Sequence, residues 1–333
     1  MSISHYIKEI GRGKDGARAL TRAQAQDLLG QVLDGQVTDL EIGGFCLAMR
    51  IKGETPEEMA GFIAAARARF ALIPPSPGGR PTVVLPSYNG ARKLPVLTPL
   101  LAQSLVNKGF RVVIHGLRQD PGRTTTAEVL EALGQPARAD VAEVRDDAVN
   151  FVPIEILSPA LRRLLDVRRV VGLRNSSHSL VKLINPCAER ALVIGSYTHP
   201  EYLVSMAETY AAIKADALLS RGIEGEAVAD ARRVQRIDAF IGGQRVRLQD
   251  AQSGPIATDT LPDWPQDISA ASIAAYIQDV LAGRRTLPMP IARQIDQIRR
   301  AHQAMASGVL PAEPATESAV SIAATAIATE SPP

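Results

Sequence analysis

The sequence predicts an α/β protein in which an N-terminal helical domain precedes a larger α/β domain with a mainly parallel sheet. Two observations support this prediction. Residues 1–72 carry apolar residues at helical spacing, helix N-cap signals and no strand pattern. After residue 81, short β-branched runs alternate with helical runs, which is the order expected of parallel strands covered by helices.

The helices of residues 1–72 are predicted from their first turns. Thr38 opens a capping box before "IGGFCLAMRI". Thr55 is followed by proline and two glutamates, which suit the first turn of a helix. The segment 73–81, "IPPSPGGRP", is rich in proline and glycine and is the predicted linker. Thr21 precedes an apolar stripe of Ala25, Leu28, Leu29 and Val32.

The α/β domain is predicted to span residues 82–305. Its expected strands are "TVVL", "RVVIHG", "RALVIGSY" and "DALLS", with a further strand pair around "QRIDAFIGGQRVRL". Ligands of such sheets bind at the carboxyl ends of the strands, which here are the loops starting near Leu85, His115 and Ser196. Residues 306–333 are rich in Ala, Ser, Thr, Pro and Glu and are predicted to be a disordered tail.

Composition restricts the class of protein. The chain has 333 residues, is 46% hydrophobic and 22% charged, and carries a net charge of +2, as expected of a globular protein. No apolar run reaches the roughly 18–20 residues that a membrane span needs, and no signal peptide is evident. Cys46 and Cys187 lack metal-ligand or disulfide spacing. We therefore expect a cytoplasmic location, no membrane partner, no metal and no cofactor.

Positive charge is concentrated in three parts of the chain. Residues 80–123 contain seven basic residues against one acid, residues 160–182 six against one, and residues 231–247 five against one. The loop "PSYNGARKL", after the first strand, combines cations with the hydroxyl and amide groups that contact phosphates. The predicted nucleic-acid or phosphate-binding residues are Ser87, Tyr88, Asn89, Arg92, Lys93, His115, Arg118, Arg123, Arg162, Arg163, Arg174, His178, Lys182, Arg232, Arg233 and Arg236.

Each of these assignments has a simpler alternative. A basic run can be an ordinary solvated face. His115 can hold a loop by a hydrogen bond, and His178 can lie in a surface loop. Aromatic residues make up 4% of the chain, so few side chains are available to stack on bases. Phosphate contacts should therefore dominate any nucleic-acid binding.

Three segments of the chain resemble the anthranilate phosphoribosyltransferase family. They are "LAMRIKGETPEEMAGF", "HGLR" with "TTTAEVLEALG", and "VRRVVGLRN" with "LINP". The resemblance implies a phosphoribosyltransferase/nucleoside-phosphorylase-like fold. It also implies a homodimer formed through the N-terminal helices, and helices near 155–175 that pack back on the helical domain.

The chain departs from this family where catalysis occurs. The family's enzymes wrap the diphosphate of their substrate in a Gly-rich GTGGD loop, which matches "LPSYN", residues 85–89, here. Their magnesium-binding Asp-Glu pair matches Ala227 and Val228, with Glu224 and Glu226 nearby. An arginine that contacts anthranilate in these enzymes matches Arg174. Such losses are similar to those of the YbiB-type branch, which implies a non-catalytic, DNA-binding protein.

Three hypotheses therefore remain open. The first is a non-catalytic homodimer that binds DNA, or RNA, without sequence specificity through basic patches. The second is a transferase that acts on a phosphoribosyl or ribose substrate with an altered active site. The third is a metabolite-binding or protein-interaction module.

Overall fold

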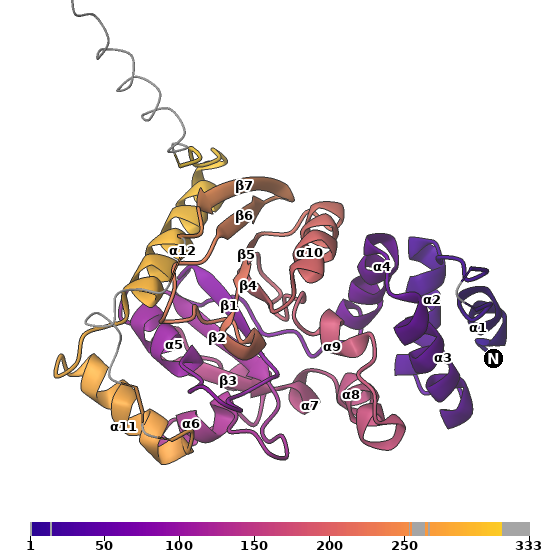
Figure 1. Ribbon diagram of the computed structural model, residues 1–333, viewed down its shortest axis with the longest axis horizontal. Coiled ribbons are helices and arrows are strands. Elements are labelled where there is room, and N and C mark those ends of the chain that lie inside the picture. Colours follow the sequence, from indigo (N-terminus) through magenta and orange to yellow (C-terminus); the bar gives the residue numbers. More distant parts are fainter. Residues whose placement is uncertain (1, 14, 253, 255–263, 266, 315–333) are drawn as a thin grey trace, which may run out of the picture.

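The structure is a computed structural model that describes residues 2–13, 15–252, 254, 264–265 and 267–314. The helical domain and the α/β domain lie side by side, with the helical domain at one end of the molecule (Figure 1). The predicted fold class, a helical N-terminal domain followed by an α/β domain with a mainly parallel sheet, is confirmed.

The helical domain contains α1 (Ser4–Ile10), α2 (Arg22–Leu33), α3 (Asp39–Lys52) and α4 (Pro56–Arg67). Capping boxes open α2 at Thr21, α3 at Thr38 and α4 at Thr55, because each threonine accepts from the third residue of its helix and that residue's side chain accepts from the threonine N–H. These are the positions predicted for the helix starts. Helix α1 had not been predicted individually.

A seven-stranded sheet forms the centre of the α/β domain, in the order β3-β2-β1-β4-β5-β6-β7. The first five strands in this order are parallel, while β6 and β7 form an antiparallel hairpin at one edge. The strands are β1 (Thr82–Ser87), β2 (Arg111–Gly116), β3 (Val149–Pro153), β4 (Leu192–Tyr197), β5 (Ala217–Arg221), β6 (Ile237–Ile241) and β7 (Gln244–Gln249). The strand order reverses between β1 and β4, which makes their carboxyl ends the topological switch point.

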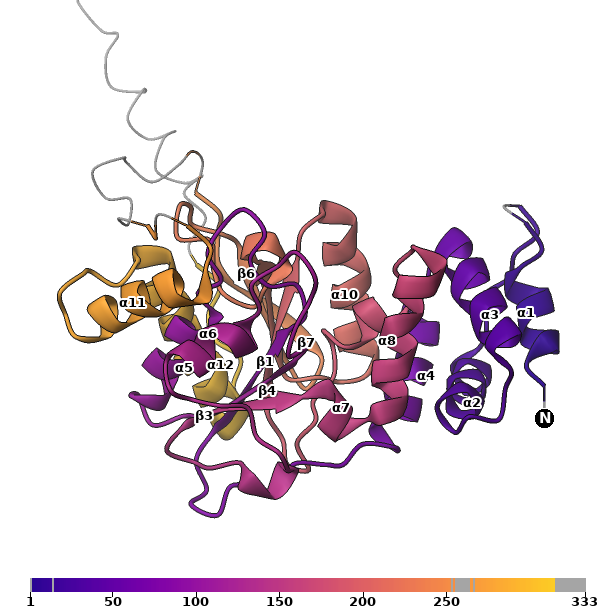
Figure 2. The ribbon, with the colours of Figure 1, turned by 90° about the horizontal axis from the view of Figure 1, so that it is seen from below.

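Alternate residues of each strand build two separate cores. Val84 of β1 faces the core that continues into the helical domain, whereas Val83 and Leu85 face the core on the other side. The first face is covered by α7 (Ile154–Leu157), α8 (Pro159–Val171), α9 (Ser177–Leu180) and α10 (Pro200–Ala212) (Figure 2). The second is covered by α5 (Thr98–Val106), α6 (Thr126–Ala132), α11 (Ala270–Leu281) and α12 (Met289–Ser307). Two short 3₁₀ helices occur at Val141–Glu143 and Ile223–Gly225.

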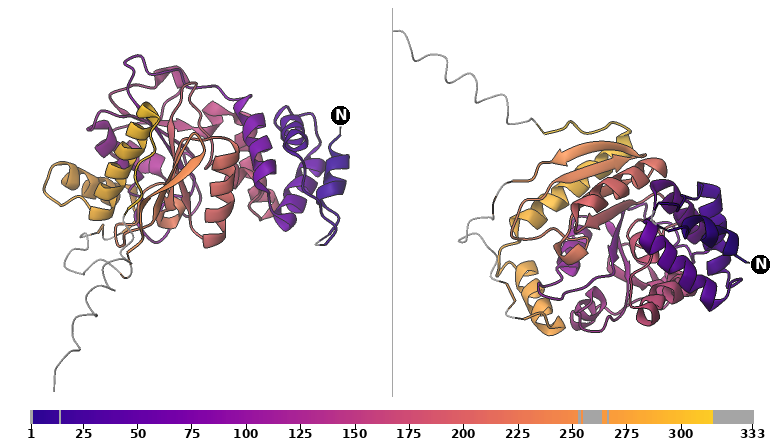
Figure 3. Two further views of the ribbon diagram at one scale, coloured as in Figure 1. Left: turned by 90° about the horizontal axis from the view of Figure 1, so that it is seen from above. Right: turned by 45° about the vertical axis from the view of Figure 1, so that its right-hand side comes forward.

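The C-terminal elements differ in detail from the sequence prediction. The predicted strand pair is the β6–β7 hairpin, along which α12 packs (Figure 3). Strand β3 and helices α11 and α12 had not been predicted. Helix α12 extends to Ser307 and so enters the predicted tail. The part of that tail from residue 315 lies outside the described residues.

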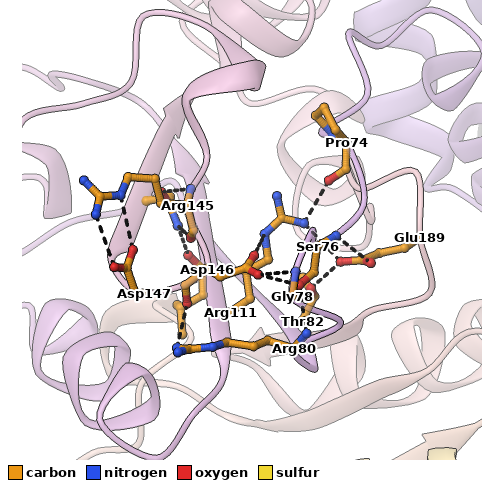
Figure 4. Close-up of polar contacts among 12 residues, drawn as sticks. Pro74, Ser76, Gly78, Arg80, Thr82, Arg111, Arg145, Asp146, Asp147 and Glu189 are labelled. Atoms are coloured by element: carbon orange, nitrogen blue, oxygen red, sulfur yellow. Dashed lines mark hydrogen bonds and ion pairs between the residues drawn. The ribbon is translucent and has the colours of Figure 1, made fainter.

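The predicted linker, residues 73–81, is held at the amino end of the sheet by a buried arginine (Figure 4). Arg111, 1% exposed, donates from Nη1 to the Pro74 carbonyl at 2.8 Å and to Glu189 Oε1 at 3.1 Å. Its Nε lies 3.3 Å from Asp146 Oδ1, and Asp146 also accepts from Ser76. These contacts tie the segment between the domains to the strands.

None of the helices that the structure describes has the length and apolarity needed to cross a membrane.

Candidate functional site

The candidate site lies at the carboxyl ends of β1, β4 and β5. The loop after β1 carries the predicted phosphate-binding residues and leads into α5. Facing it is the 3₁₀ turn Ile223–Gly225, which follows β5 and continues into Glu226. Contacts between this loop and this turn define the chemistry of the site.

Two carboxylates of the turn occupy the backbone N–H groups of the loop. Glu226 Oε1 accepts from the N–H groups of Asn89 and Gly90 at 2.8 and 2.9 Å. Glu224 accepts from the N–H groups of Arg92 and Lys93, at 2.6 and 3.0 Å. On its other oxygen, Glu226 accepts from the hydroxyl groups of Ser87, at 2.5 Å, and Thr98, at 3.2 Å. The N–H groups of the loop therefore form an anion-binding cradle, and the anions that occupy it are the carboxylates of Glu224 and Glu226.

The backbone of the turn is specialised for this close approach. Glu224 has a positive φ of 49°, a conformation that non-glycine residues rarely adopt. Gly225 has φ +85°, and a Cβ there would lie 2.1 Å from the Asn89 side-chain nitrogen. Its carbonyl accepts from Ser196 Oγ at 2.8 Å and from Lys182 Nζ at 3.1 Å. Glycine is thus required where the turn meets the loop.

Lys182 lies behind this turn in a largely buried position. Burial lowers its pKa to about 8, Glu226 opposes the shift, and Arg174 and Arg123 add to it. The ammonium group therefore carries its charge at pH 7 but releases its proton more readily than a surface lysine.

A cavity of about 600 Å³ separates the α/β domain from the helical domain and contains four predicted residues. Asn89, Arg174, His178 and Lys182 line one wall, while the start of α4 contributes Thr55 and Pro56. Burial and the nearby Arg174 lower the pKa of His178 to about 4, so the imidazole is neutral at pH 7. The cavity has the size of a small-molecule site.

The third predicted basic run lies at the same edge of the sheet. Arg232, Arg233 and Arg236 line a second cavity of about 660 Å³. A smaller one, of about 170 Å³, lies between Arg232 and Leu94 of the β1 loop. Thr198 lines all three cavities, so the cavities adjoin one another at this edge of the sheet.

Several predicted contact residues are buried and are bonded to other groups of the protein. Ser87 and Asn89 are 4% and 6% exposed, and Ser87 is engaged with Glu226. The Tyr88 hydroxyl bonds His115 Nδ1 at 2.7 Å inside the protein. His115 is fully buried, and burial lowers its pKa to about 3, so it is a neutral interior residue. The loop's outward cations are Arg92 and Lys93, both exposed.

Each of the remaining predicted cations has a partner within the protein. Arg118 and Arg162 share Glu155, with N–O distances of 3.1 and 3.5 Å. Arg163, on α8, pairs with Asp39 of α3 at 2.6 Å and so reaches the helical domain. Arg123 donates to the Asn89 carbonyl at 2.9 Å and supports the β1 loop. These arginines are paired or structural, and they do not line the three cavities.

Sequence reasoning missed the role of three residues of the site. It did not assign Arg221, the last residue of β5, which lines both arginine-bordered cavities. It also treated Glu224 and Glu226 only as neighbours of a lost metal pair. The signal available was a glycine flanked by two glutamates directly after a strand, opposite a loop rich in donors.

Comparison with known proteins agrees with this architecture. Residues 4–70 match the family model described as "Glycosyl transferase family, helical bundle domain". YbiB of Escherichia coli (strain K12), an uncharacterized protein, is 39% identical over 294 residues, which cover 86% of this chain and 90% of YbiB. An anthranilate phosphoribosyltransferase of Methanosarcina acetivorans is 30% identical over 201 residues, covering 59% of this chain and 52% of that enzyme.

Two solved structures share the fold over almost the whole chain. Anthranilate phosphoribosyltransferase from Thermus thermophilus matches with a TM-score of 0.70 and 23% identity, covering 91% of this chain and 89% of that one. The Saccharomyces cerevisiae enzyme in complex with PRPP and Mg matches with a TM-score of 0.65 and 14% identity, covering 92% and 94%. Fold and helical domain together define a phosphoribosyltransferase-like protein. The chain belongs to the phosphoribosyltransferase-like family that includes YbiB.

The site does not fit PRPP and Mg, with which the Saccharomyces cerevisiae enzyme forms a complex. Ala227 and Val228, at the positions where the resemblance implies an acidic pair in the enzymes, are buried and apolar. Glu224 and Glu226 precede them in the chain, and together they accept from four backbone N–H groups of the loop. A diphosphate in the cradle would compete with these carboxylates for the same donors.

Proposed function

We propose that this protein is a non-catalytic phosphoribosyltransferase homologue that binds nucleic acid without sequence specificity. Binding occurs through the basic surface at the carboxyl edge of its sheet. DNA and RNA are both candidate partners, because both have the phosphate backbone that the cations would contact. The site has few groups that read bases, so no sequence preference is expected.

The observation that carries the proposal is the occupied cradle. The N–H group of Asn89, in the segment that matches the family's diphosphate loop, and those of Gly90, Arg92 and Lys93 directly after it already bind Glu226 and Glu224. The two carboxylates place negative charge beside this loop, which opposes the binding of a diphosphate there by repulsion. With the cradle occupied, we assign the surrounding cations to phosphate contacts and not to transfer chemistry.

The positions of these cations support contacts to a chain of phosphates. Arg92 and Lys93 extend outward from the loop, while their backbone N–H groups are held by Glu224. Arg174 lies at the interdomain cavity, and Arg232 and Arg233 lie beyond Thr198. A backbone with regularly spaced phosphates can bridge such separate positive groups, whereas a compact metabolite cannot.

Dimerisation would extend this surface. Helix α3 exposes Leu40, Leu47 and Ile51, which lie on one side of the helix and are 87%, 44% and 68% exposed. We propose that this face forms a two-fold interface, which would double every basic patch.

A second candidate function is supported by the interdomain cavity. Its volume of about 600 Å³ and its retained Arg174 suit a small anionic substrate, as in a transferase with an altered site. An assay for pyrophosphate release from phosphoribosyl pyrophosphate with Mg²⁺ tests this candidate. Turnover at a rate similar to that of the family's enzymes would reject the non-catalytic proposal.

Binding is tested by fluorescence anisotropy with single- and double-stranded DNA and RNA at several salt concentrations. A protein that neutralises six to ten phosphates should lose roughly 10³–10⁵ in affinity between 50 and 200 mM salt. The Arg92→Ala/Lys93→Ala variant should weaken binding about equally for every sequence and lower the salt slope by roughly one per lost contact. Alanine keeps the backbone N–H groups that bind Glu224, so the loop should keep its fold.

The matched control is Lys108→Ala/Arg299→Ala. Both residues are exposed, Lys108 follows α5 near the amino end of the sheet, and Arg299 lies on α12. This variant should bind like the wild type. Affinity that does not change with salt, or an equal loss in both double variants, would contradict the proposal.

A further inference from the structure

The second cavity has features beyond those of a surface that only follows a phosphate backbone. It lies at the carboxyl end of β5, beside the segment 232–236 that leads into β6, and encloses about 660 Å³. Four arginines border it, namely Arg221, Arg232, Arg233 and Arg236. A concave site with this many guanidinium groups suits a ligand of high negative charge density.

Buried aspartates hold these arginines without neutralising them. Asp230 pairs with Arg232 and Arg233, at N–O distances of 2.8 and 3.7 Å. Asp238, fully buried in β6, pairs with Arg236 and with Arg245 of β7, at 2.9 and 2.5 Å. Each aspartate is therefore shared by two arginines.

Arg221 adds a further positive charge. Within the described part of the chain, no carboxylate pairs with Arg221. Together with Arg245, the four arginines that border the cavity carry five positive charges. The two aspartates, Asp230 and Asp238, carry two negative charges, so the excess is three positive charges. Two further acids lie nearby: Glu224 is directed to the β1 loop N–H groups, and Asp250 pairs with Arg247 at 3.1 Å.

The ion pairs also fix the guanidinium groups before a ligand arrives. Arg232 is bonded to Asp230 on one side, and its guanidinium carbon lies 5.8 Å from the centre of the Trp264 ring. A guanidinium group has five N–H donors, so donors remain after one carboxylate is bound. Groups held in this way lose little conformational entropy when they bind an anion.

Part of the cavity wall is apolar. Pro200, Leu203 and Val234 line it beside Tyr197. Burial raises the pKa of Tyr197, so its phenol is neutral at pH 7 and keeps a hydroxyl donor. A ligand that matches this wall and the arginines needs a flat, weakly polar part joined to a phosphate.

We propose that this cavity binds a phosphorylated nucleoside, with its phosphate on Arg221 and Arg233 and its base and sugar against Tyr197 and Leu203. The same chemical group can come from a free nucleotide or from the phosphorylated end of a nucleic-acid strand. The strand-end form rests on the proposed function, whereas the free-nucleotide form does not depend on it.

The test uses AMP as the free-nucleotide probe, measured by isothermal titration calorimetry. It also uses a single-stranded DNA oligonucleotide with either a 5′-phosphate or a 5′-hydroxyl group, measured by anisotropy. We compare the wild type with Arg221→Ala/Arg233→Ala. Neither residue is buried, and Asp230 keeps Arg232 when Arg233 is removed, so this variant should fold normally. The matched control is Arg22→Ala/Arg299→Ala, which removes two exposed arginines elsewhere.

If the ligand is the free nucleotide, we expect the variant to bind AMP at least tenfold more weakly than the wild type does. If the ligand is a strand end, we expect the preference for the 5′-phosphorylated strand over the 5′-hydroxyl strand to fall by at least tenfold. The control variant should bind like the wild type in both measurements. Binding of AMP identifies the free nucleotide as a ligand, and preference for the 5′-phosphate alone identifies the strand end. Absence of both, or equal binding by the wild type and the variant, would overturn the inference. Salt-dependent binding of the 5′-hydroxyl strand tests the proposed function separately, because that strand carries only internal phosphates.

Discussion

At the scale of single residues, His115 was predicted as a contact residue and is an interior one. It ends a strand of the central sheet, bonds the Tyr88 hydroxyl and is fully buried. A histidine that precedes a glycine at the end of a strand can contact a phosphate or form an interior hydrogen bond, so the sequence does not distinguish these two roles. Burial decides between them, because a phosphate contact requires exposure or a charge, and burial removes both.

This burial predicts a pH dependence of stability. Burial lowers the pKa of His115 to about 3 in the folded state, while the ordinary value of 6.5 applies to the unfolded chain. Between these values the unfolded state binds a proton that the folded state does not, so stability is fully present above pH 6.5 and is lost as pH falls toward 3. One proton corresponds to about 1.4 kcal/mol per pH unit in the free energy of unfolding.

Urea denaturation between pH 4 and 6 measures this effect. His115→Gln should reduce the slope of the free energy of unfolding against pH by about one proton, whatever its effect on stability at pH 7. His5→Gln is the matched control, since His5 is exposed, and it should keep the slope of the wild type. An unchanged slope in His115→Gln would show that this residue titrates similarly in the folded and unfolded states.

At the scale of elements, the segment 73–81 is a connection with a fixed path. Its prolines and glycines suggested a linker, and nothing in its own sequence showed that Arg111 would hold it. Arg111 comes from β2, and its partners Asp146 and Glu189 lie outside the segment. The contacts form only when the strands are assembled, so local sequence could not reveal them.

The Arg111→Met variant tests this network. Removing the guanidinium leaves Asp146 and Glu189 without their buried counter-charge and frees the Pro74 carbonyl. Breaking a buried pair costs about 3–5 kcal/mol, and we expect about 3 because both carboxylates are partly exposed. The free energy of unfolding, measured by urea denaturation, should fall by this amount.

The control for Arg111→Met is Arg80→Met in the same network. Arg80 is exposed and donates to the Asp146 carbonyl at 3.2 Å, so its loss should cost less than about 1 kcal/mol. Similar losses in the two variants would mean that the buried position of Arg111 has no special importance.

At the scale of the whole molecule, the exposed face of α3 is the main apolar surface of the helical domain. Leu40, Leu47 and Ile51 recur at intervals of seven and four residues, which places them on one side of the helix. Their exposure suits an interface between two copies of the chain, because a two-fold contact covers the same face on both.

Sedimentation equilibrium at micromolar concentration tests this interface. The wild type should be a dimer, and Leu47→Gln/Ile51→Gln should shift it toward monomer while weakening nucleic-acid binding, because the two basic surfaces would separate. Val170→Gln, at an exposed apolar residue of α8, should remain a dimer. A wild-type monomer, or a variant that dimerises like the wild type, would exclude α3 as the interface.

Local sequence signals were sufficient for most of the architecture. The capping boxes at Thr21, Thr38 and Thr55 lie where they were predicted, because a cap depends on residues three positions apart. The parallel strands and the β6–β7 hairpin also followed from short patterns. Strand β3 was missed because it is a short run, "VNFVP", whose pairing with β2 is a long-range contact.

The sequence by itself determined the fold class, the helical domain, the family and the loss of a glycine-rich diphosphate loop. Those properties depend on residue type, spacing and motif, which are readable along the chain. Only the tertiary structure decided that Glu224 and Glu226 fill the β1 loop, that His115 is interior, and that Arg221 joins the second cavity. Glu226 lies more than 130 positions from the loop it binds, and hydrogen bonds over such separations exist only once the sheet brings both segments to one edge.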